Sequence, residues 1–138
     1  MHNKFGTLYI VSTPIGNLND ITNRAIEILN KVEVCAAEDT RRSINLFNAH
    51  SIKTKLTSYH KFSEKTKTKS LIKKLLDGKD IAIISDAGTP LISDQGRYLV
   101  NAAIEAGIEI VPIPWVTAVI TALSISGFNT DNFKYFGF

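Results

Sequence analysis

The chain has 138 residues, of which 44% are hydrophobic and 21% are charged, the make-up of one ordinary soluble domain with a hydrophobic core. It lacks the run of about 20 apolar residues that a membrane helix needs, and its start lacks the apolar stretch of a signal peptide, so we expect a cytoplasmic protein. The single cysteine, Cys35, excludes an internal disulfide and should be a small core residue. Three scattered histidines provide no metal-ligand spacing, so no metal is expected.

The formal net charge is only +3, but the basic residues are unevenly distributed. Half of all lysines and arginines fall in one stretch, opposed there only by Glu64: Lys53, Lys55, Lys61, Lys65, Lys67, Lys69, Lys73 and Lys74. This stretch predicts one strongly positive surface, which would attract a polyanion through counterion release. The alternative is an ordinary solvated helix face.

Short β-branched runs alternate with amphipathic stretches along the chain. Residues 7–12 (TLYIVS) predict a first strand, and a helix capped by Asp20 or Thr22 follows, with apolar residues at helical spacing. A second strand is expected at 34–37, a short helix at 40–48 and a third strand at 56–59. Ser63 then opens the lysine-rich helix, which Gly78 ends in the left-handed conformation.

The second half continues this alternation. Residues 81–85 (IAIIS) are the most apolar run and should form the central strand, because parallel strands covered on both faces are continuously hydrophobic. A helix at 94–106 ending at Gly107, a strand at 108–113, a helix at 116–126 and the start of a strand at 133–138 follow. The pattern predicts an α/β fold: a mostly parallel five-stranded sheet with helices on both faces.

In such a sheet, ligands bind outside the carboxyl ends of the strands, where loops present backbone amides. In the loop after the first strand, Pro14 and Gly16 either bring the backbone close to a ligand or form a plain turn. In the loop after the central strand, Asp86 and Thr89 either contact a ligand or cap a turn. The sequence has neither a dinucleotide-binding glycine motif nor a P-loop.

Acids and guanidinium groups are concentrated in the segment EDTRR after the second strand. Asp39 or Thr40 can cap the next helix while the arginines pair with nearby acids. Alternatively, Arg41 or Arg42 holds a phosphate group with two hydrogen bonds. His60 is either a proton acceptor near neutral pH or a structural residue. The residues alone therefore indicate a small α/β domain with a ligand-binding edge.

Five segments together carry a family resemblance: LYIVSTPIGNLNDIT, AAEDTRRS, TSYH, IAIISDAGTPLISDQG and ALSISGF. In this order they resemble the tetrapyrrole-methylase-like class of S-adenosylmethionine-dependent enzymes. Within that class they are most similar to the methyltransferases that modify the 2′-oxygen of a cytidine in small-subunit (16S) ribosomal RNA. The resemblance covers the chain from about Thr7 onward.

The resemblance implies a two-domain, usually homodimeric protein that binds S-adenosylmethionine between its domains, with residues 1–138 supplying only the amino-terminal α/β domain. The cofactor-binding residues that it implies are Pro14, Ile15, Gly16, Asp86, Thr89, Thr117 and Ala118. The two candidate bases that would accept the proton of the ribose hydroxyl are Asp39 and His60. Glu38 falls in the same motifs. Candidate contacts to the ribosomal RNA or the small ribosomal subunit are Arg41, Arg42, Lys61 and Lys65.

Three parts of the sequence depart from the family pattern. Trp115 replaces a glycine of the usual Pro-Gly-Pro-Ser-Ala loop, so its indole would fill space that the cofactor needs or force the loop open. Gln95 replaces a proline, a mild change in a first helical turn. After His60 the usual second histidine and asparagine are missing, and Lys61, Phe62 and Ser63 stand there instead.

We therefore expect this chain alone to bind S-adenosylmethionine weakly or not at all, with no turnover. One alternative is a non-catalytic RNA-binding or dimerisation module that has lost the cofactor pocket through Trp115. Another is a small-molecule methylase acting on a tetrapyrrole, although the lysine-rich stretch favours RNA. The aromatic side chains at the end of the chain predict self-association: Phe133, Tyr135, Phe136 and Phe138.

Overall fold

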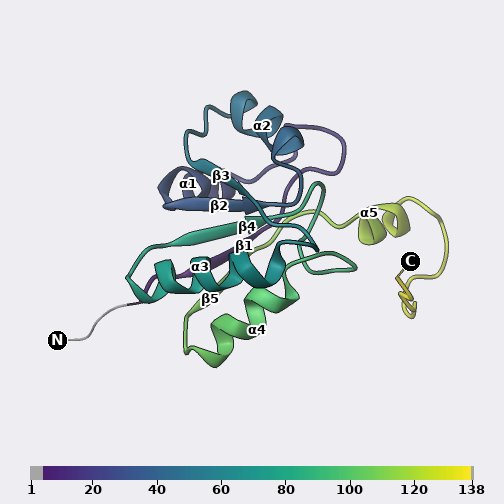
Figure 1. Cartoon of the computed structure of the whole chain (residues 1–138). Helices are drawn as coiled ribbons and strands as arrows, with labels where there is room; N and C mark the ends of the chain where they lie inside the picture. Colours follow the sequence, from purple (N-terminus) through teal and green to yellow (C-terminus); the bar gives the residue numbers. More distant parts are fainter. Residues whose placement is uncertain (1–4, 138) are drawn as a thin grey trace.

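The computed structural model describes residues 5–137, in which five strands alternate with five helices (Figure 1). The strands are β1 (Leu8–Val11), β2 (Val34–Ala37), β3 (Lys55–Ser58), β4 (Ile81–Ile84) and β5 (Ile110–Ile113). The helices are α1 (Asn23–Lys31), α2 (Thr40–Ala49), α3 (Glu64–Leu76), α4 (Arg97–Glu105) and α5 (Ala118–Ser124). No helix within this range has the length and apolarity needed to cross a bilayer.

All five strands run parallel in a single sheet, in the order β3-β2-β4-β1-β5. β4 lies at the centre, where Ala82 pairs with Tyr9 of β1 on one side and with Cys35 of β2 on the other. All four residues of β4 are buried, as expected for a strand covered on both faces. The predicted α/β fold and the central position of β4 are therefore confirmed.

The two faces of the sheet are covered by different pairs of helices (Figure 1). α1 and α2 pack on one face, through a cluster that includes Leu29, Phe47 and the fully buried Cys35. α3 and α4 pack on the other face, through a cluster that includes Leu71 and Leu99. Burial raises the pKa of the Cys35 thiol, which keeps it protonated and consistent with the predicted core role.

Most of the predicted helix ends are confirmed. Thr22 caps α1, because its hydroxyl accepts a hydrogen bond from the Ala25 N–H at 3.0 Å. Gly78 after α3 and Gly107 after α4 adopt φ values of 82° and 68°, the left-handed conformation that glycine tolerates. Ser63 precedes α3 but makes no side-chain capping bond.

The helix expected from residue 94 begins three residues later, at Arg97. Leu91, Ser93 and Gly96 all have positive φ values, so the backbone between Asp86 and α4 is an irregular loop. Gln95 consequently lies in this loop, before the helix, and the expectation that it occupies a first helical turn is wrong.

α5 stands apart from the two helical layers (Figure 1) and has no buried residue. The segment after it, residues 125–137, is coil; we call it the carboxyl-terminal segment. The strand expected at 133–138 does not form within the described residues, and Phe138 lies outside them. A strand needs a neighbour with which to share hydrogen bonds, and in Figure 1 this segment lies beyond α5, away from the sheet.

Candidate active site

The carboxyl ends of the strands bring three loops together. Thr13 follows β1, Glu38 follows β2, and Asp86 lies two residues after β4. Thr13 and Gly88 exchange backbone hydrogen bonds of 2.9 and 3.0 Å, which join the loop after β1 to the loop after β4. The predicted ligand-binding edge is therefore a single, connected region of the molecule.

Hydroxyl groups fix the shape of the loop after β4. Ser12 and Thr89 share a hydrogen bond of 3.0 Å between their hydroxyl oxygens, and the Thr13 hydroxyl donates to the Ser85 carbonyl at 3.2 Å. The Ser85 hydroxyl donates to the Gly88 carbonyl at 3.2 Å. Gly88 itself has a φ of 79°, which favours glycine at this turn. The loop is therefore held in place without any ligand.

A cavity of about 540 Å³ opens against this loop, within the range of about 300–1,000 Å³ that is usual for small-molecule sites. It is lined by residues of the loops after β1, β2, β4 and β5, by the start of α5 and by the carboxyl-terminal segment: Ile15, Glu38, Asp86, Ala87, Gly88, Thr89, Ile92, Ser93, Asp94, Thr117, Ala118, Val119 and Tyr135. Three carboxylates, Glu38, Asp86 and Asp94, make its electrostatic environment acidic.

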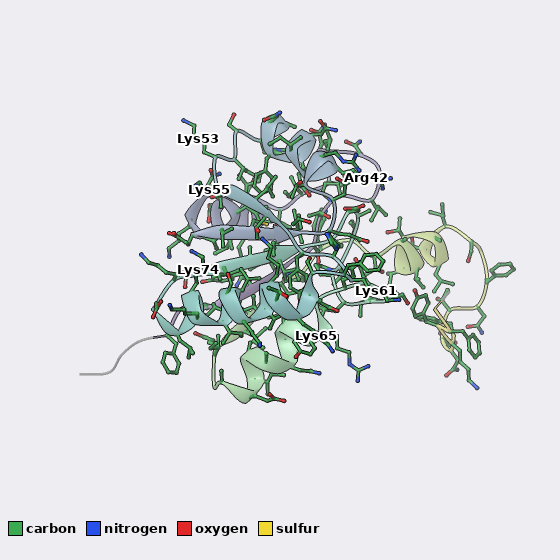
Figure 2. The ribbon with its side chains drawn as sticks, viewed as in Figure 1. Arg42, Lys53, Lys55, Lys61, Lys65 and Lys74 are labelled. Carbon is green, nitrogen blue, oxygen red and sulfur yellow. The ribbon has the colours of Figure 1, made fainter. Side chains whose placement is uncertain are left out.

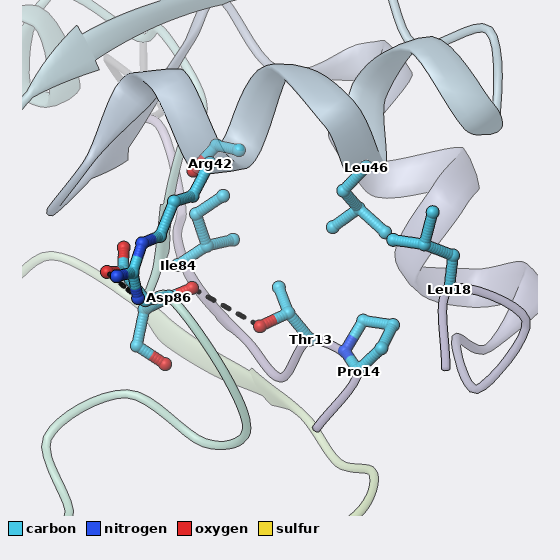
Figure 3. A pocket seen from close by; sticks show the side chains of 9 residues that line it. Thr13, Pro14, Leu18, Arg42, Leu46, Ile84 and Asp86 are labelled. Carbon is cyan, nitrogen blue, oxygen red and sulfur yellow. Dashed lines mark hydrogen bonds and ion pairs between the residues drawn. The ribbon is translucent and has the colours of Figure 1, made fainter. Parts of the chain in front are cut away.

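The structure brings five of the seven expected cofactor residues into this one cavity: Ile15, Asp86, Thr89, Thr117 and Ala118. Pro14 lines a second, smaller cavity of about 70 Å³ that shares Asp86 with the first (Figure 3). Gly16 lines neither of the two, and a Cβ atom built on it would meet open space.

Trp115 does not fill the larger cavity. Its side chain is 45% exposed, and neither cavity found within residues 5–137 includes it in the lining. The indole therefore does not occupy this cavity, while the second possibility, that Trp115 forces its loop open, stays a prediction, as does the non-catalytic alternative.

Asp86 holds the start of α2 in place. Its Oδ1 accepts a hydrogen bond from the Asp39 N–H at 3.1 Å, and its Oδ2 pairs with the Arg42 guanidinium at 3.4 Å (Figure 3). Both carboxylate oxygens are thus used by the protein itself. Asp86 therefore joins the loop after β4 to the start of α2.

Asp39 is the amino-terminal cap of α2, as one of the two sequence interpretations predicted. Its Oδ1 accepts from the Arg41 N–H at 2.9 Å and from Arg41 Nε at 3.1 Å, while its Oδ2 accepts from Arg41 Nη2 at 3.0 Å. Hydrogen bonds from Arg41 lower the pKa of Asp39, and the same pairing raises the pKa of Arg41. Asp39 points to its own helix and does not line either cavity.

His60 also lies outside both cavities. Its backbone exchanges hydrogen bonds with the Ser63 side chain at 3.3 and 3.2 Å, and its ring lies edge-on to Phe62 with centroids 6.2 Å apart. Nδ1 is buried and makes no hydrogen bond within the described part of the chain. The structure does not bring the two predicted bases together at the cavity.

Glu38 lines the larger cavity, although the sequence analysis assigns it no role of its own. It directly follows β2, just as Asp86 closely follows β4, and this position at a strand's carboxyl end is the signal that identifies it. Burial, then the charges of Asp94 and Asp86, raise the pKa of Glu38, while Arg42 lowers it. Gln95 was also missed as a site residue: its Nε2 donates to Glu38 Oε1 at 3.0 Å.

The lysine-rich stretch does not form one positive surface. β3 runs toward the edge of the sheet where the strands end, and α3 runs away from that edge. The lysines at the start and end of the stretch therefore lie at one end of the molecule, and those in its middle lie at the other end. Figure 2 accordingly shows Lys53, Lys55 and Lys74 at one end of the molecule. Lys61 and Lys65 lie toward the opposite end, nearer α5, as Arg42 does.

The residues in the described range offer no group of three or more side chains that could hold a metal ion.

Comparison with known proteins identifies relatives of this chain. The family model described as "Tetrapyrrole (Corrin/Porphyrin) Methylases" matches residues 7–134. A protein named "Ribosomal RNA small subunit methyltransferase I" from Halalkalibacterium halodurans is 51% identical over 133 residues, which is 96% of this chain and 46% of that protein. A protein of the same name from Escherichia coli O157:H7 is 51% identical over 136 residues, 99% of this chain and 48% of that protein. The chain thus spans about half the length of these curated relatives.

Two solved structures share the fold. Uroporphyrin-III-C-methyltransferase from Thermus thermophilus superimposes with a TM-score of 0.65 at 24% identity, covering 90% of this chain and 54% of that one. A cobalt precorrin-4 methyltransferase gives a TM-score of 0.69 at 18% identity, covering 86% of this chain and 49% of that one.

Proposed function

Because the chain belongs to the tetrapyrrole methylase family, we propose that it provides one half of the active site of an S-adenosylmethionine-dependent methyltransferase acting on small-subunit ribosomal RNA. The reaction would be methylation of the 2′-oxygen of a cytidine ribose. The main support is the meeting of the loops after β1, β4 and β5 at one cavity of about 540 Å³. Relatives at about 51% identity carry the name of an rRNA methyltransferase.

The cavity suits S-adenosylmethionine in chemistry as well as in size. When bound, this cofactor supplies an electrophilic methyl group on a positively charged sulfonium. The carboxylates of Glu38, Asp86 and Asp94 favour a cation over an anion in this space. Ile15 and Ala118 offer apolar contacts, and the hydroxyls of Thr89 and Thr117 offer hydrogen bonds, in the proportion usual for cofactor sites.

The basic residues support RNA as the substrate. Arg42, Lys61 and Lys65 lie toward the α5 side of the molecule, outside the acidic cavity (Figure 2). Such groups would hold the phosphate backbone and fix its position beside the cavity. The proposal includes a cytoplasmic location and a homodimer, in agreement with the family resemblance.

Binding of the cofactor can be tested by nuclear magnetic resonance. Titration of the ¹⁵N-labelled chain with S-adenosylhomocysteine should shift amides at residues 15, 86–89 and 117–119, with a dissociation constant of about 1 mM or weaker, equivalent to about −4 kcal/mol. ATP, an anionic adenosine compound, is the control and should leave these amides unshifted. Shifts elsewhere in the chain, or tight binding by this chain alone, would contradict the proposal.

Activity can be tested in a chimera in which this chain replaces the matching half of the Escherichia coli relative. The chimera should transfer a labelled methyl group to small-subunit ribosomal RNA taken from cells that lack that relative. Methylation of a porphyrinogen without methylation of RNA would instead favour the tetrapyrrole alternative.

Recognition of RNA can be tested by its dependence on salt. Binding of a fragment of small-subunit ribosomal RNA should weaken as salt rises, and substitution of Lys61 and Lys65 by Ala should reduce the slope by about 0.7–0.9 for each phosphate that the variant no longer neutralises. The matched variant with Lys53 and Lys74 replaced by Ala removes the same charge from the other end of the molecule and should keep the slope. An affinity that barely changes with salt would exclude RNA as the ligand.

A further inference from the structure

The carboxylate of Glu38 differs from the two other acids of the larger cavity. Asp86 is engaged by Arg42 and by a backbone amide, and Asp94 Oδ1 accepts from the Gln95 N–H at 2.8 Å. Glu38 is the lining acid that, within residues 5–137, has neither an ion pair nor a backbone donor. Its hydrogen-bond donor is the neutral side-chain amide of Gln95, at 3.0 Å.

We propose that Glu38 is the group that accepts the proton of the substrate hydroxyl, and that Gln95 is the positioning residue that holds its carboxylate. This inference rests on the proposed function, because it assigns a role within that same cavity.

The two bases suggested by the sequence are less suited to this role. The Asp39 carboxylate accepts three hydrogen bonds from Arg41, and these favour its charged form. A carboxylate with a lowered pKa is a poor proton acceptor. His60 lies outside the cavity, so a substrate bound there would not reach it without rearrangement.

The surroundings of Glu38 make it the more basic carboxylate. Burial, the neighbouring charges of Asp94 and Asp86, and a side-chain hydrogen bond with Asp94 disfavour its ionised form, so its pKa is raised, and only Arg42 opposes them. A raised pKa brings a carboxyl group nearer to neutral pH, where general bases are most effective. The effect is the opposite of the one that Arg41 has on Asp39.

The proton balance of the reaction needs such a group. Methyl transfer from a sulfonium to a ribose oxygen forms a C–O bond, breaks the C–S bond with its electron pair left on sulfur, and releases one proton from the hydroxyl. We assign that proton to the Glu38 carboxylate, which becomes a neutral acid and then loses the proton to solvent. No oxidant, reductant or metal is needed for this balance.

Gln95 can orient the carboxylate without competing for the proton. An amide does not titrate near neutral pH, so its N–H remains a donor throughout the reaction. Gln95 Oε1 is buried and has no hydrogen-bond partner among the described residues. No hydrogen bond to Oε1 therefore competes with Glu38 in setting the orientation of the amide. A proline, usual at this position in the family that the chain resembles, has no such donor.

The first test measures Glu38 directly in this chain. The ¹³C chemical shift of the Glu38 carboxyl, followed by pH titration, should give a pKa above the value of about 4.3 found in model peptides. Gln95→Met removes the donor while keeping a similar size, and should raise the pKa further because the ionised form loses its hydrogen bond. A midpoint at or below the peptide value, or no response to Gln95→Met, would overturn the assignment.

The second test uses the chimera. Glu38→Gln should lower the methylation rate by about 10² to 10⁴, the usual contribution of a general base. Glu38→Asp should recover part of the rate. Gln95→Met should move the acidic limb of the pH–rate profile toward higher pH with little change in KM.

Asp39→Asn is the matched comparison, because asparagine also caps a helix and the variant should fold. Its rate should fall by less than the factor of about 10² expected for loss of the base. If Glu38→Gln keeps the parent rate, the assignment fails and the proposed function stands. If the parent chimera itself does not methylate RNA, the proposed function fails.

Discussion

At the scale of single residues, Gly6 shows how closely two backbone segments approach each other. Its N–H donates to the Leu75 carbonyl at 2.7 Å, and a Cβ atom at this position would overlap the Lys79 carbonyl group. The Lys79 backbone cannot rotate away from an added Cβ atom, as the end of a flexible side chain could. The absence of a side chain at Gly6 therefore allows the entry into β1 to pack against the end of α3.

Gly6→Ala should destabilise the protein by about 1–3 kcal/mol, the usual cost of overpacking. Urea unfolding followed by circular dichroism measures this change. Gly16→Ala is the control, because nothing lies within 4 Å of the added Cβ, and its unfolding midpoint should match that of the parent chain. Equal midpoints for both variants would show that the Lys79 backbone moves aside at no cost.

Glu38 should make stability depend on pH. Its pKa is raised in the folded state, so its contribution to stability is complete below the unfolded pKa and is lost as pH rises through the folded pKa. Glu38→Gln removes the charge, so the variant should become more stable than the parent chain as pH rises from about 4 to about 7. Thermal unfolding across this range measures the difference, and a constant difference would contradict a raised pKa.

At the scale of elements, a buried hydroxyl pair joins β3 to α3. Tyr59 is 1% exposed and its hydroxyl shares a hydrogen bond of 2.9 Å with the hydroxyl of Thr68, which is 2% exposed. Burial raises the pKa of Tyr59 to about 12, so the phenol stays protonated at neutral pH. The pair links the strand end to the helix on the α3 face of the sheet.

Tyr59→Phe should cost about 1–2 kcal/mol, because the Thr68 hydroxyl is left buried without its partner. Chemical denaturation gives this value. Tyr98→Phe makes the same chemical change at a side chain that is 47% exposed, and should stay within about 0.5 kcal/mol of the parent chain. A similar loss in both variants would mean that the buried pair adds no stability.

The elements were the most predictable part of the molecule. The continuous apolar run of β4 predicts its central, fully buried position, and Thr22, Gly78 and Gly107 predict helix ends through their residue chemistry. The predicted start of α4 at residue 94 is too early, because Leu91, Ser93 and Gly96 have positive φ values that a helix does not allow. Tertiary packing sets those angles, and local sequence does not encode it.

The sequence predicts which loops form the candidate site, but not the role that each residue has in it. Position at the carboxyl end of a strand identifies Ile15, Asp86 and Thr89, since parallel strands end at one edge of the sheet. Whether an acid is already held by an ion pair or a hydrogen bond depends on its side-chain partners in the folded structure. The pairing of Asp39 with Arg41, and the amide of Gln95 beside Glu38, appear only when the loops are in place.

At the scale of the whole molecule, the surface carries an apolar region at α5 and the carboxyl-terminal segment. Ile125, Phe128 and Phe136 are 85%, 78% and 90% exposed, and α5 has no buried residue. A helix of seven residues is too short to be stable by itself in water, so α5 needs a surface to pack against. We expect a second copy of the chain to supply that surface.

The chain should therefore self-associate as its concentration rises. Light scattering should give an average mass above that of one chain, and replacing Ile125, Phe128 and Phe136 together by Ser should return it to the mass of one chain. Phe62→Ser is the control, because Phe62 is 96% exposed but lies outside this region. A mass that stays at one chain across concentrations would contradict the expectation.

The strand order also has a consequence for synthesis on the ribosome. β1 pairs only with β4 and β5, and the hydrogen bond between Thr7 and Asp80 spans 73 residues. As the chain emerges, β1 must wait until β4 has been made before it finds a neighbour, whereas β2 can pair as soon as the nearby β3 has been made. Nascent chains should thus expose the apolar β1 for several seconds, at about 5–20 residues per second, and chaperones would bind it in that interval.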